Sequence, residues 1–445
     1  MNAGLLQISL ALVVSIVGIV LLTRYLNLHA FFSLLIASIV FGLLVGKSFL
    51  ETLNSMQAGF GSLLHQIGLL VAVGSCLGMM MEKTGAMEVI GHRIIKLFGI
   101  RYSVLAMTTI GIIVGIPVFC DSGFIILSRL ISSIASQSTA NSAQLSLALS
   151  SGLYTTHVLV PPTPGPLAAA ANLNFSEHIS TLIFISLIAS IPVAIVSYFF
   201  SMKLGSTINA DLLLNELKGE RSKISGWKAF LPLILPIVLI ASASIPGIVS
   251  LPDNLSSLVR IIGHPVVALM IGLLLSALLI QKKDTKETPL WISTALKDAG
   301  IILLITGAGG AFGAVIKTSG IDILLKDYVS SSSSQGIIFL FIAFVIAAIL
   351  KTAQGSSTSS IIITSSLLAP LAVSAGFVSP AQLSVLVIAI GAGAMTVSHA
   401  NDSYFWVVSQ FGGISPRDAF RSFTLLTLAQ GITALITSII LFQLV

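Results

Sequence analysis

One segment of this chain occurs twice, and this repetition constrains the fold more than any other feature. Residues 69–91 align without gaps on residues 304–326. The glycines that coincide are Gly74 with Gly309, Gly78 with Gly313 and Gly85 with Gly320. At the same offset, the run FCDSG around Asp121 falls on the run AQGSST that follows Lys351. Interrupted segments that recur in the two halves of an apolar chain are the best sequence indication of a transporter's binding site.

The composition places these segments in a membrane. Hydrophobic residues make up 55% of the chain and charged residues only 9%, whereas a soluble domain carries roughly 25% charged residues. Apolar runs that are long enough, or nearly so, to cross a bilayer as helices include 5–22, 31–46, 229–249 and 263–280. We expect an all-α polytopic membrane protein with about 10–12 spanning segments, some of them broken.

The charges between the apolar runs indicate how the chain crosses the membrane. Lys and Arg concentrate in three loops, 82–101, 203–228 and 281–297, which we therefore place in the cytoplasm. Two spans separate the second loop from the third, so these two placements agree. Counting spans back from the first loop puts the N-terminus in the periplasm, and the two copies then cross in opposite directions. We predict two inverted-topology repeats with broken helices or re-entrant hairpins.

The chain divides into five parts on this reading. They are N-terminal spans (1–58), repeat 1 (59–202), a cytoplasmic connector (203–228), linking spans with a cytoplasmic loop (229–296) and repeat 2 (297–445). The two cysteines, Cys76 and Cys120, are isolated and have no metal-ligand spacing. The run GLLVGKS (42–48) lacks the first glycine of a phosphate-binding loop. We expect neither a cofactor nor a metal, and the net charge of +6 reflects topology rather than nucleic-acid binding.

The first break of repeat 1 lies at residues 115–127. Gly115 and Pro117 weaken a helix there, and Asp121 sits between apolar flanks. An acid in a membrane segment is costly unless it faces a cavity or a partner. The alternative is that Asp121 caps a helix starting at Ser122. Both readings hold together, because a helix start inside the membrane also offers free N–H groups to an anion.

The equivalent break of repeat 2 begins at Lys351, after a long apolar run. On the functional reading the lysine pairs with a substrate carboxylate, and the following residues donate hydrogen bonds from side chains and unwound backbone. Those residues are Gln354, Gly355, Ser356, Ser357 and Thr358. The alternative is a lysine that snorkels to the membrane surface from a helix end, with hydroxyl groups that only pack helix against helix.

Each repeat contains a second break. Residues 157–172 hold four prolines together with His157 and Thr163, so no regular helix continues through them. Residues 398–406 concentrate polar groups, which are His399, Asn401, Asp402 and Ser403. Broken backbone at membrane depth is tolerated only where it is buried in protein or lines a watery cavity. The alternatives are an extracytoplasmic loop for the first segment and a polar turn beside an aromatic belt for the second.

At these segments the chain resembles the gluconate permease family of bacterial sugar-acid symporters, over nearly its whole length. The residues that carry the resemblance are 118–124, 160–166, 307–320, 354–358 and 397–406. The resemblance implies proton-coupled uptake of a small hydroxylated carboxylate such as gluconate. Relatives that carry D-serine or other sugar acids leave the substrate open. The family is also related to anion transporters with paired re-entrant hairpins and an elevator-like motion.

The chain departs from the family pattern at three positions. Familiar members often have glutamate where this chain has Asp121, arginine or another residue at Lys351, and a second histidine where this chain has Thr163. A lysine contacts a carboxylate as a point charge and lacks the guanidinium fork. The pocket therefore favours a different sugar acid from that of the familiar members.

We therefore predict a proton symporter of the bacterial inner membrane for a short sugar acid. Its partners are the substrate, a proton or alternatively sodium, the bilayer and, in a homodimer, a second copy of the chain. Lys351 and the helix starts near Ser122 and Ser356 hold the carboxylate. The substrate hydroxyls bond to Thr163, Gln354, Ser356, Thr358, Asn401 and Ser403. The candidates for the coupling proton are Asp121, Asp402, His157 and His399.

Two other functions compete with this one. A passive organic-anion channel has the same polar lining but cannot concentrate its substrate. An intramembrane aspartyl enzyme would use Asp121 and Asp402 as a dyad, but the motif of that class is absent and the repeat would go unexplained. We expect a transporter and no enzyme.

Overall fold

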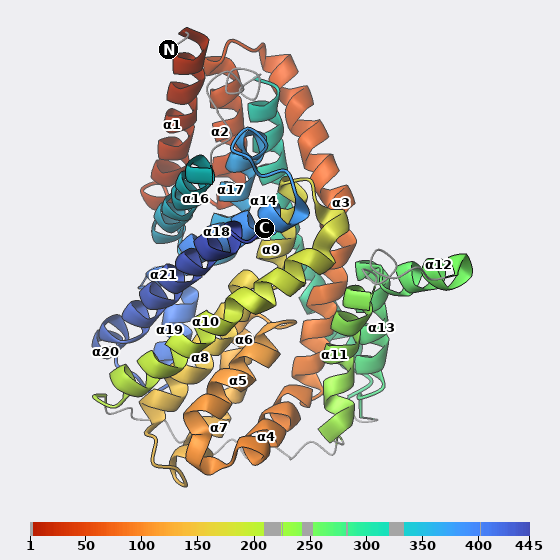
Figure 1. Ribbon diagram of the computed structural model, residues 1–445, viewed down its shortest axis with the longest axis vertical. Helices are drawn as coiled ribbons and strands as arrows, with labels where there is room; N and C mark the ends of the chain where they lie inside the picture. Colours follow the sequence, from red (N-terminus) through yellow and green to blue (C-terminus); the bar gives the residue numbers. More distant parts are fainter. Residues whose placement is uncertain are drawn as a thin grey trace.

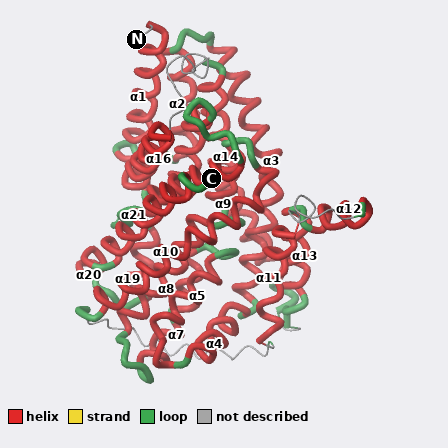
Figure 2. Tube along the Cα trace, in the orientation of Figure 1, coloured by secondary structure: helices red, strands yellow, loops and turns green. Residues whose placement is uncertain are grey.

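Most of the described chain is helical, and the expected all-α class is confirmed (Figures 1 and 2). No strand occurs among these residues. The structure is a computed structural model that describes residues 3–208, 224, 226–242, 252–281, 284–319, 333–400 and 402–445.

Several helices have the length and composition of membrane spans. Five described helices are long and apolar enough to cross a membrane, and the number is seven if each of two bent pairs counts as one span. Five shorter apolar helices add to these. The helices outside the central segments are α1 (Ala3–Arg24), α2 (Ala30–Leu44), α7 (Arg129–Ala135), η2 (Ser176–His178), α10 (Ile179–Gly205), α11 (Gly226–Ser242), α12 (Asp253–Ile262), α13 (Pro265–Ala277), α20 (Pro416–Arg421) and α21 (Phe423–Phe442).

The two copies of the repeated segment end two long helices that pack along each other. These are α3 (Phe49–Lys83) and α14 (Thr288–Lys317). Their ends correspond within one residue in the sequence alignment of the copies. A Cβ atom added at Gly59 would lie 2.3 Å from the carbonyl oxygen of Gly310, so the helices touch through bare backbone. The remainder of the second copy, residues 320–326, lies outside the described residues.

The prediction of a loop at the first basic stretch, residues 82–101, is wrong. Most of residues 82–101 form α4 (Ala86–Phe98), followed by η1 (Ile100–Tyr102) and a 110° bend into α5 (Ser103–Gly115). In α4, Met87, Ile90 and Ile94 are buried, at the three- and four-residue spacing of an amphipathic helix. Arg93 and Lys96 therefore lie on the exposed face of this helix. Part of the third basic stretch is also helical, since α14 begins at Thr288.

The four predicted breaks are confirmed as interruptions between helices. Each falls between a longer helix and a half-helix that follows it. The pairs are α5 with α6 (Cys120–Leu127), α8 (Ser142–Leu159) with α9 (Pro164–Asn172), α16 (Ser333–Gln354) with α17 (Ser357–Ala372), and α18 (Pro380–Met395) with α19 (Ser403–Phe411). The polar runs of the sequence thus coincide with the starts of four half-helices.

The half-helices pair across the two halves of the chain. α6 packs against α19, and α9 packs against α17. Each contact joins a half-helix of residues 59–202 to one of residues 297–445, and exchanging the two segments converts one contact into the other. In Figure 1, α9 and α17 lie nearer the end of the molecule that carries the N-terminus, and α6 and α19 lie nearer the opposite end. The polar breaks therefore lie between them.

Candidate functional site

A buried ion pair occupies the broken region of the second half. The Nζ atom of Lys351 lies 2.5 Å from Oδ2 of Asp402, and the two side chains are only 1% and 5% exposed. Lys351 sits in the last turn of α16, and Asp402 precedes the first residue of α19. A lysine that snorkels would carry its ammonium to water. The burial of Lys351 excludes that reading for this conformation.

The carboxylate of Asp402 is held by several donors. Its Oδ2 atom accepts a short hydrogen bond from the hydroxyl of Ser398 in addition to the lysine contact. Its Oδ1 atom accepts from the backbone N–H of Tyr404 at 3.1 Å, which makes Asp402 the N-cap of α19. A helix N-terminus stabilises a negative charge. The carboxylate of Asp402 is therefore fixed beside Lys351 by donors on both of its oxygen atoms.

The surroundings of Lys351 bring in the first half of the chain. Its Nζ also lies 3.4 Å from the carbonyl oxygen of Gly355 and 5.9 Å from the centre of the Tyr154 ring. Tyr154, on α8, shares a 2.7 Å hydrogen bond with the hydroxyl of Ser357 at the start of α17. Gly355 has a φ of +73°, which L-residues other than glycine rarely adopt. The turn between α16 and α17 thus exposes a carbonyl oxygen to the ammonium.

Asp121 connects the first break to the last one. Its Oδ1 atom accepts a 3.2 Å hydrogen bond from the hydroxyl of Ser403, which joins α6 to α19. The proposed capping role of Asp121 is wrong, because α6 begins at Cys120 with Phe119 as its N-cap. Asp121 and Ser122 instead lie in the first turn, where the helix dipole favours an anion.

His157 and Thr163 flank the proline-rich break. His157, in the last turn of α8, is buried and packs its ring 5.7 Å from that of Phe119. Its Nδ1 atom has no hydrogen-bond partner among the described residues. Thr163 begins α9, and its hydroxyl donates to the carbonyl of Val160 at 2.6 Å. A small cavity between residues 117–119 and 162–164 also touches α3, so the two breaks of the first half face each other.

The remaining predicted residues cluster where α16 gives way to α17. Gln354 buries both polar atoms of its side chain, and neither finds a partner within the described part of the chain. Ser356 caps α17 by accepting from the N–H of Ser359 at 3.2 Å. Thr358 lies against α9, where a Cβ atom at Gly165 would come within 3.8 Å of its Cα. An unsatisfied buried amide is costly, which makes Gln354 available to a ligand.

The predicted residues of the second break in the second half, 398–406, have differing outcomes. The carbonyl oxygen of His399 accepts from the N–H of Asp402 at 2.8 Å, which shapes the turn before α19. The prediction for Asn401 lies outside the described residues. Three contacting residues were not predicted: Tyr154, Ser398 and Tyr404. Both tyrosines stand within helices and neither carries a charge, so their residue type alone did not mark them as contacts of the ion pair. Tyr404 bonds the carbonyl of Ser150 at 2.9 Å.

Comparison with known proteins identifies the family. The GntP family permease model matches residues 7–445. The chain belongs to the GntP permease family. It is 30% identical to the inner membrane permease YgbN of Escherichia coli K12, over 96% of both chains. It is 28% identical to a gluconate permease of Pseudomonas aeruginosa, again over 96% of both chains.

A solved transporter shares the fold. The structure of the YdaH transporter of Alcanivorax borkumensis superposes with a TM-score of 0.51, covering 88% of this chain and 87% of that one at 14% identity. Together with the permease relatives, the apolar helices establish a multi-pass inner-membrane transporter rather than an enzyme.

Proposed function

We propose that this permease imports gluconate or a related short sugar acid together with a proton. The buried Lys351–Asp402 pair is the observation that carries the proposal. A relative with 28% identity is named as a gluconate permease. The pair supplies a cation that suits a carboxylate and an acid that suits a proton, in a region where four helix starts converge.

The coupling follows from competition for one ammonium group. In the ion pair, Asp402 neutralises Lys351. When Asp402 takes up a proton, Lys351 remains as a buried cation without a counter-charge, which is strongly unfavourable. The substrate carboxylate then replaces Asp402 as the partner. One proton and one monocarboxylate therefore enter together, and the net charge of the site is the same before and after loading.

Helix starts and polar side chains complete the substrate site. Ser122 lies in the first turn of α6 and Ser356 is the N-cap of α17, and the free N–H groups of these helix starts favour a carboxylate. Gln354 is poised to bond a substrate hydroxyl because both its polar atoms lack partners in the described chain. The other proposed hydroxyl contacts are Thr163, Thr358, Asn401 and Ser403. Asp121, His157 and His399 are further candidates for moving the proton.

The same proposal includes the topology. We infer two inverted repeats, 59–202 and 297–445, with the N-terminus in the periplasm and the connector 203–228 in the cytoplasm. The crossed contacts of α6 with α19 and of α9 with α17 support a twofold relation between the repeats. Cysteine labelling from either side of the membrane at Ser48 and at Arg101 tests the orientation, since the two positions are expected on opposite faces.

Uptake by purified protein in liposomes tests the transport function. We expect gluconate to accumulate against its gradient when the lumen is alkaline, and the accumulation to collapse when the proton gradient is dissipated. Lys351→Ala is expected to abolish uptake. A sodium requirement without a pH effect would assign the coupling to sodium instead. Flux that only runs downhill would identify a passive channel.

Asp402→Asn separates binding from coupling. With no carboxylate to compete for Lys351, this variant is expected to bind gluconate with an affinity that no longer depends on pH, while it fails to concentrate the substrate. Asp418→Asn is the matched control, because Asp418 lies at the start of α20, where its carboxylate bonds Ser415 and not the ion pair. An Asp402→Asn variant that still drives concentrative uptake would exclude Asp402 as the coupling acid.

A further inference from the structure

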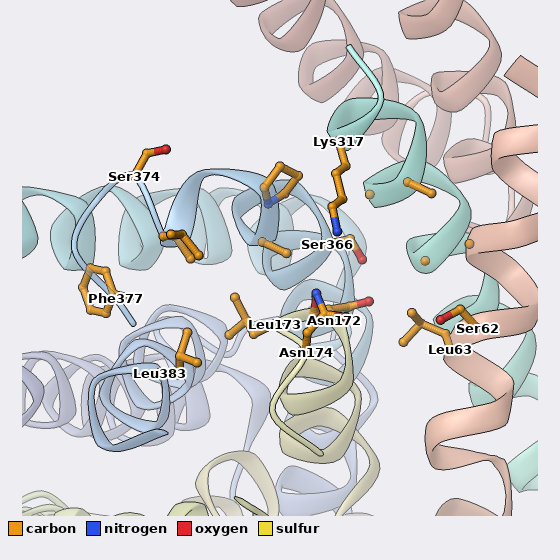
Figure 3. A pocket seen from close by; sticks show the side chains of 18 of the residues that line it. Ser62, Leu63, Asn172, Leu173, Asn174, Lys317, Ser366, Ser374, Phe377 and Leu383 are labelled. Carbon is orange, nitrogen blue, oxygen red and sulfur yellow. The ribbon is translucent and has the colours of Figure 1, made fainter. Parts of the chain in front are cut away.

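A second cavity lies apart from the ion pair. It has a volume of about 650 Å³ and is lined by α3, α14, the C-terminal ends of α9 and α17 and the start of α18 (Figure 3). Its lining includes none of the residues assigned above to the substrate site. α9 starts at the central breaks and delivers Asn172 and Leu173 to this cavity. At a rise of 1.5 Å per residue, the half-helix separates the two places by roughly 13 Å.

The polar groups of this cavity suit a hydroxylated anion. Figure 3 shows the ammonium of Lys317 pointing toward Ser366 and Asn172. No acidic residue lines the cavity, and no carboxylate among the described residues pairs with Lys317. Asn172 donates to the carbonyl of Ile362 at 3.1 Å and to Ser365 at 2.8 Å. Its amide oxygen has no donor in the described chain and can accept from a ligand hydroxyl.

We propose that this cavity is a staging site that binds the sugar acid before it reaches Lys351. The proposal rests on the proposed function. The cavity lies toward the end of the molecule that carries the N-terminus, which is the periplasmic side in the proposed orientation. Ligand sites of about 300–1,000 Å³ hold small molecules, and a lone cation in a cleft raises the local concentration of anions. The ligand class is a polyhydroxylated monocarboxylate.

Lys317 also stands in the last turn of α14, where a cation stabilises the helix end. A purely structural role would change stability but not the attraction of anions. A chemical probe separates the two roles without requiring transport. Ser62 is exposed on α3 and lines the cavity, so Ser62→Cys introduces a thiol facing Lys317. The native Cys76 and Cys120 are buried, and the protein without the added cysteine gives the background.

The experiment compares how fast an anionic sulfonate and a cationic ammonium methanethiosulfonate label Ser62→Cys. We expect Lys317→Gln to lower the ratio of anionic to cationic labelling rates at least about three-fold at low ionic strength, with the difference vanishing in high salt. Lys47→Gln, which removes a lysine outside the cavity lining, is expected to leave the ratio unchanged. An unchanged ratio in Lys317→Gln overturns the proposal.

Protection by ligand tests the site itself. Gluconate is expected to slow labelling of Ser62→Cys even in the Lys351→Ala background, where the central site is lost, and Lys317→Gln is expected to remove that protection. Protection that disappears with Lys351→Ala alone would overturn the staging site while leaving the proposed function intact. Protection that persists in Lys351→Ala, without uptake by the wild type, would support the cavity and count against the proposed transport.

Discussion

Removing one charge of the central ion pair should destabilise the fold more than removing both charges together. At 2.5 Å and an effective dielectric constant of about 20, the attraction between Lys351 and Asp402 is about 7 kcal/mol. Removing each charge from water costs several kcal/mol, which offsets most of that attraction. Removing one partner leaves the other charge buried and uncompensated, at a cost of about 3–5 kcal/mol. Lys351→Met/Asp402→Asn should therefore be more stable than Asp402→Asn alone.

Thermal unfolding in detergent, followed by scanning fluorimetry, measures the coupling energy between the two charges. It compares the wild type with Lys351→Met, Asp402→Asn and the double variant. The neighbours Lys83 and Glu82, 2.9 Å apart with side chains 43% and 15% exposed, reach water and provide the control pair. Neutralising either of these should change the free energy of unfolding by no more than about 1 kcal/mol. If Asp402→Asn unfolded at the wild-type temperature, or if the double variant were the least stable, the reasoning about a dry, mutually compensating pair would be refuted.

Three further changes test the surrounding architecture. Gly59→Ala places a Cβ atom 2.3 Å from a carbonyl oxygen of α14 and should destabilise the protein by about 1–3 kcal/mol, whereas Gly61→Ala, with open space around it, should be neutral or stabilising in the same unfolding assay. Gly355→Ala should cost about 1–2 kcal/mol because its φ is +73°, and it should reduce gluconate uptake beyond any loss of folded protein. Gln430→Leu removes donors to groups on α8 and α10 and should lower the free energy of unfolding by about 1–3 kcal/mol, with the KM for uptake unchanged.

The interruptions could be predicted because they have a covalent cause. Proline removes a backbone donor and weakens a helix, and the runs at 115–117 and 161–166 combine it with glycine or with further prolines, which favours a break there. The hydroxyl run after Lys351 and the polar turn at Asp402 interrupt apolar sequence in the same visible way. These signals located four helix starts without any knowledge of the fold. The direction of the repeats stays a prediction.

The partners across the site could not be predicted, because contact depends on packing. Lys351 and Asp402 are 51 residues apart, and each was assigned a role of its own toward substrate or proton. Their pairing depends on how α18 returns to the tip of α16. Tyr154 could not be predicted for the same reason, because its hydroxyl bonds Ser357, which lies 203 residues further along the chain. Counting charges led to the prediction of a loop at residues 86–98, which form a helix. The count considers only the basic residues and not the helical period of the apolar ones.

The spacing of the ion pair along the chain bears on how the protein is made. Lys351 leaves the ribosome before Asp402, so for 51 residues of synthesis its ammonium has no counter-charge from this site. The buried position of the helix that carries Lys351 becomes favourable only after Asp402 and α19 have been synthesised. Assembly of the second half is therefore tied to the completion of its last half-helix. A nascent chain that stops short of residue 402 lacks the carboxylate that neutralises Lys351 in the folded protein.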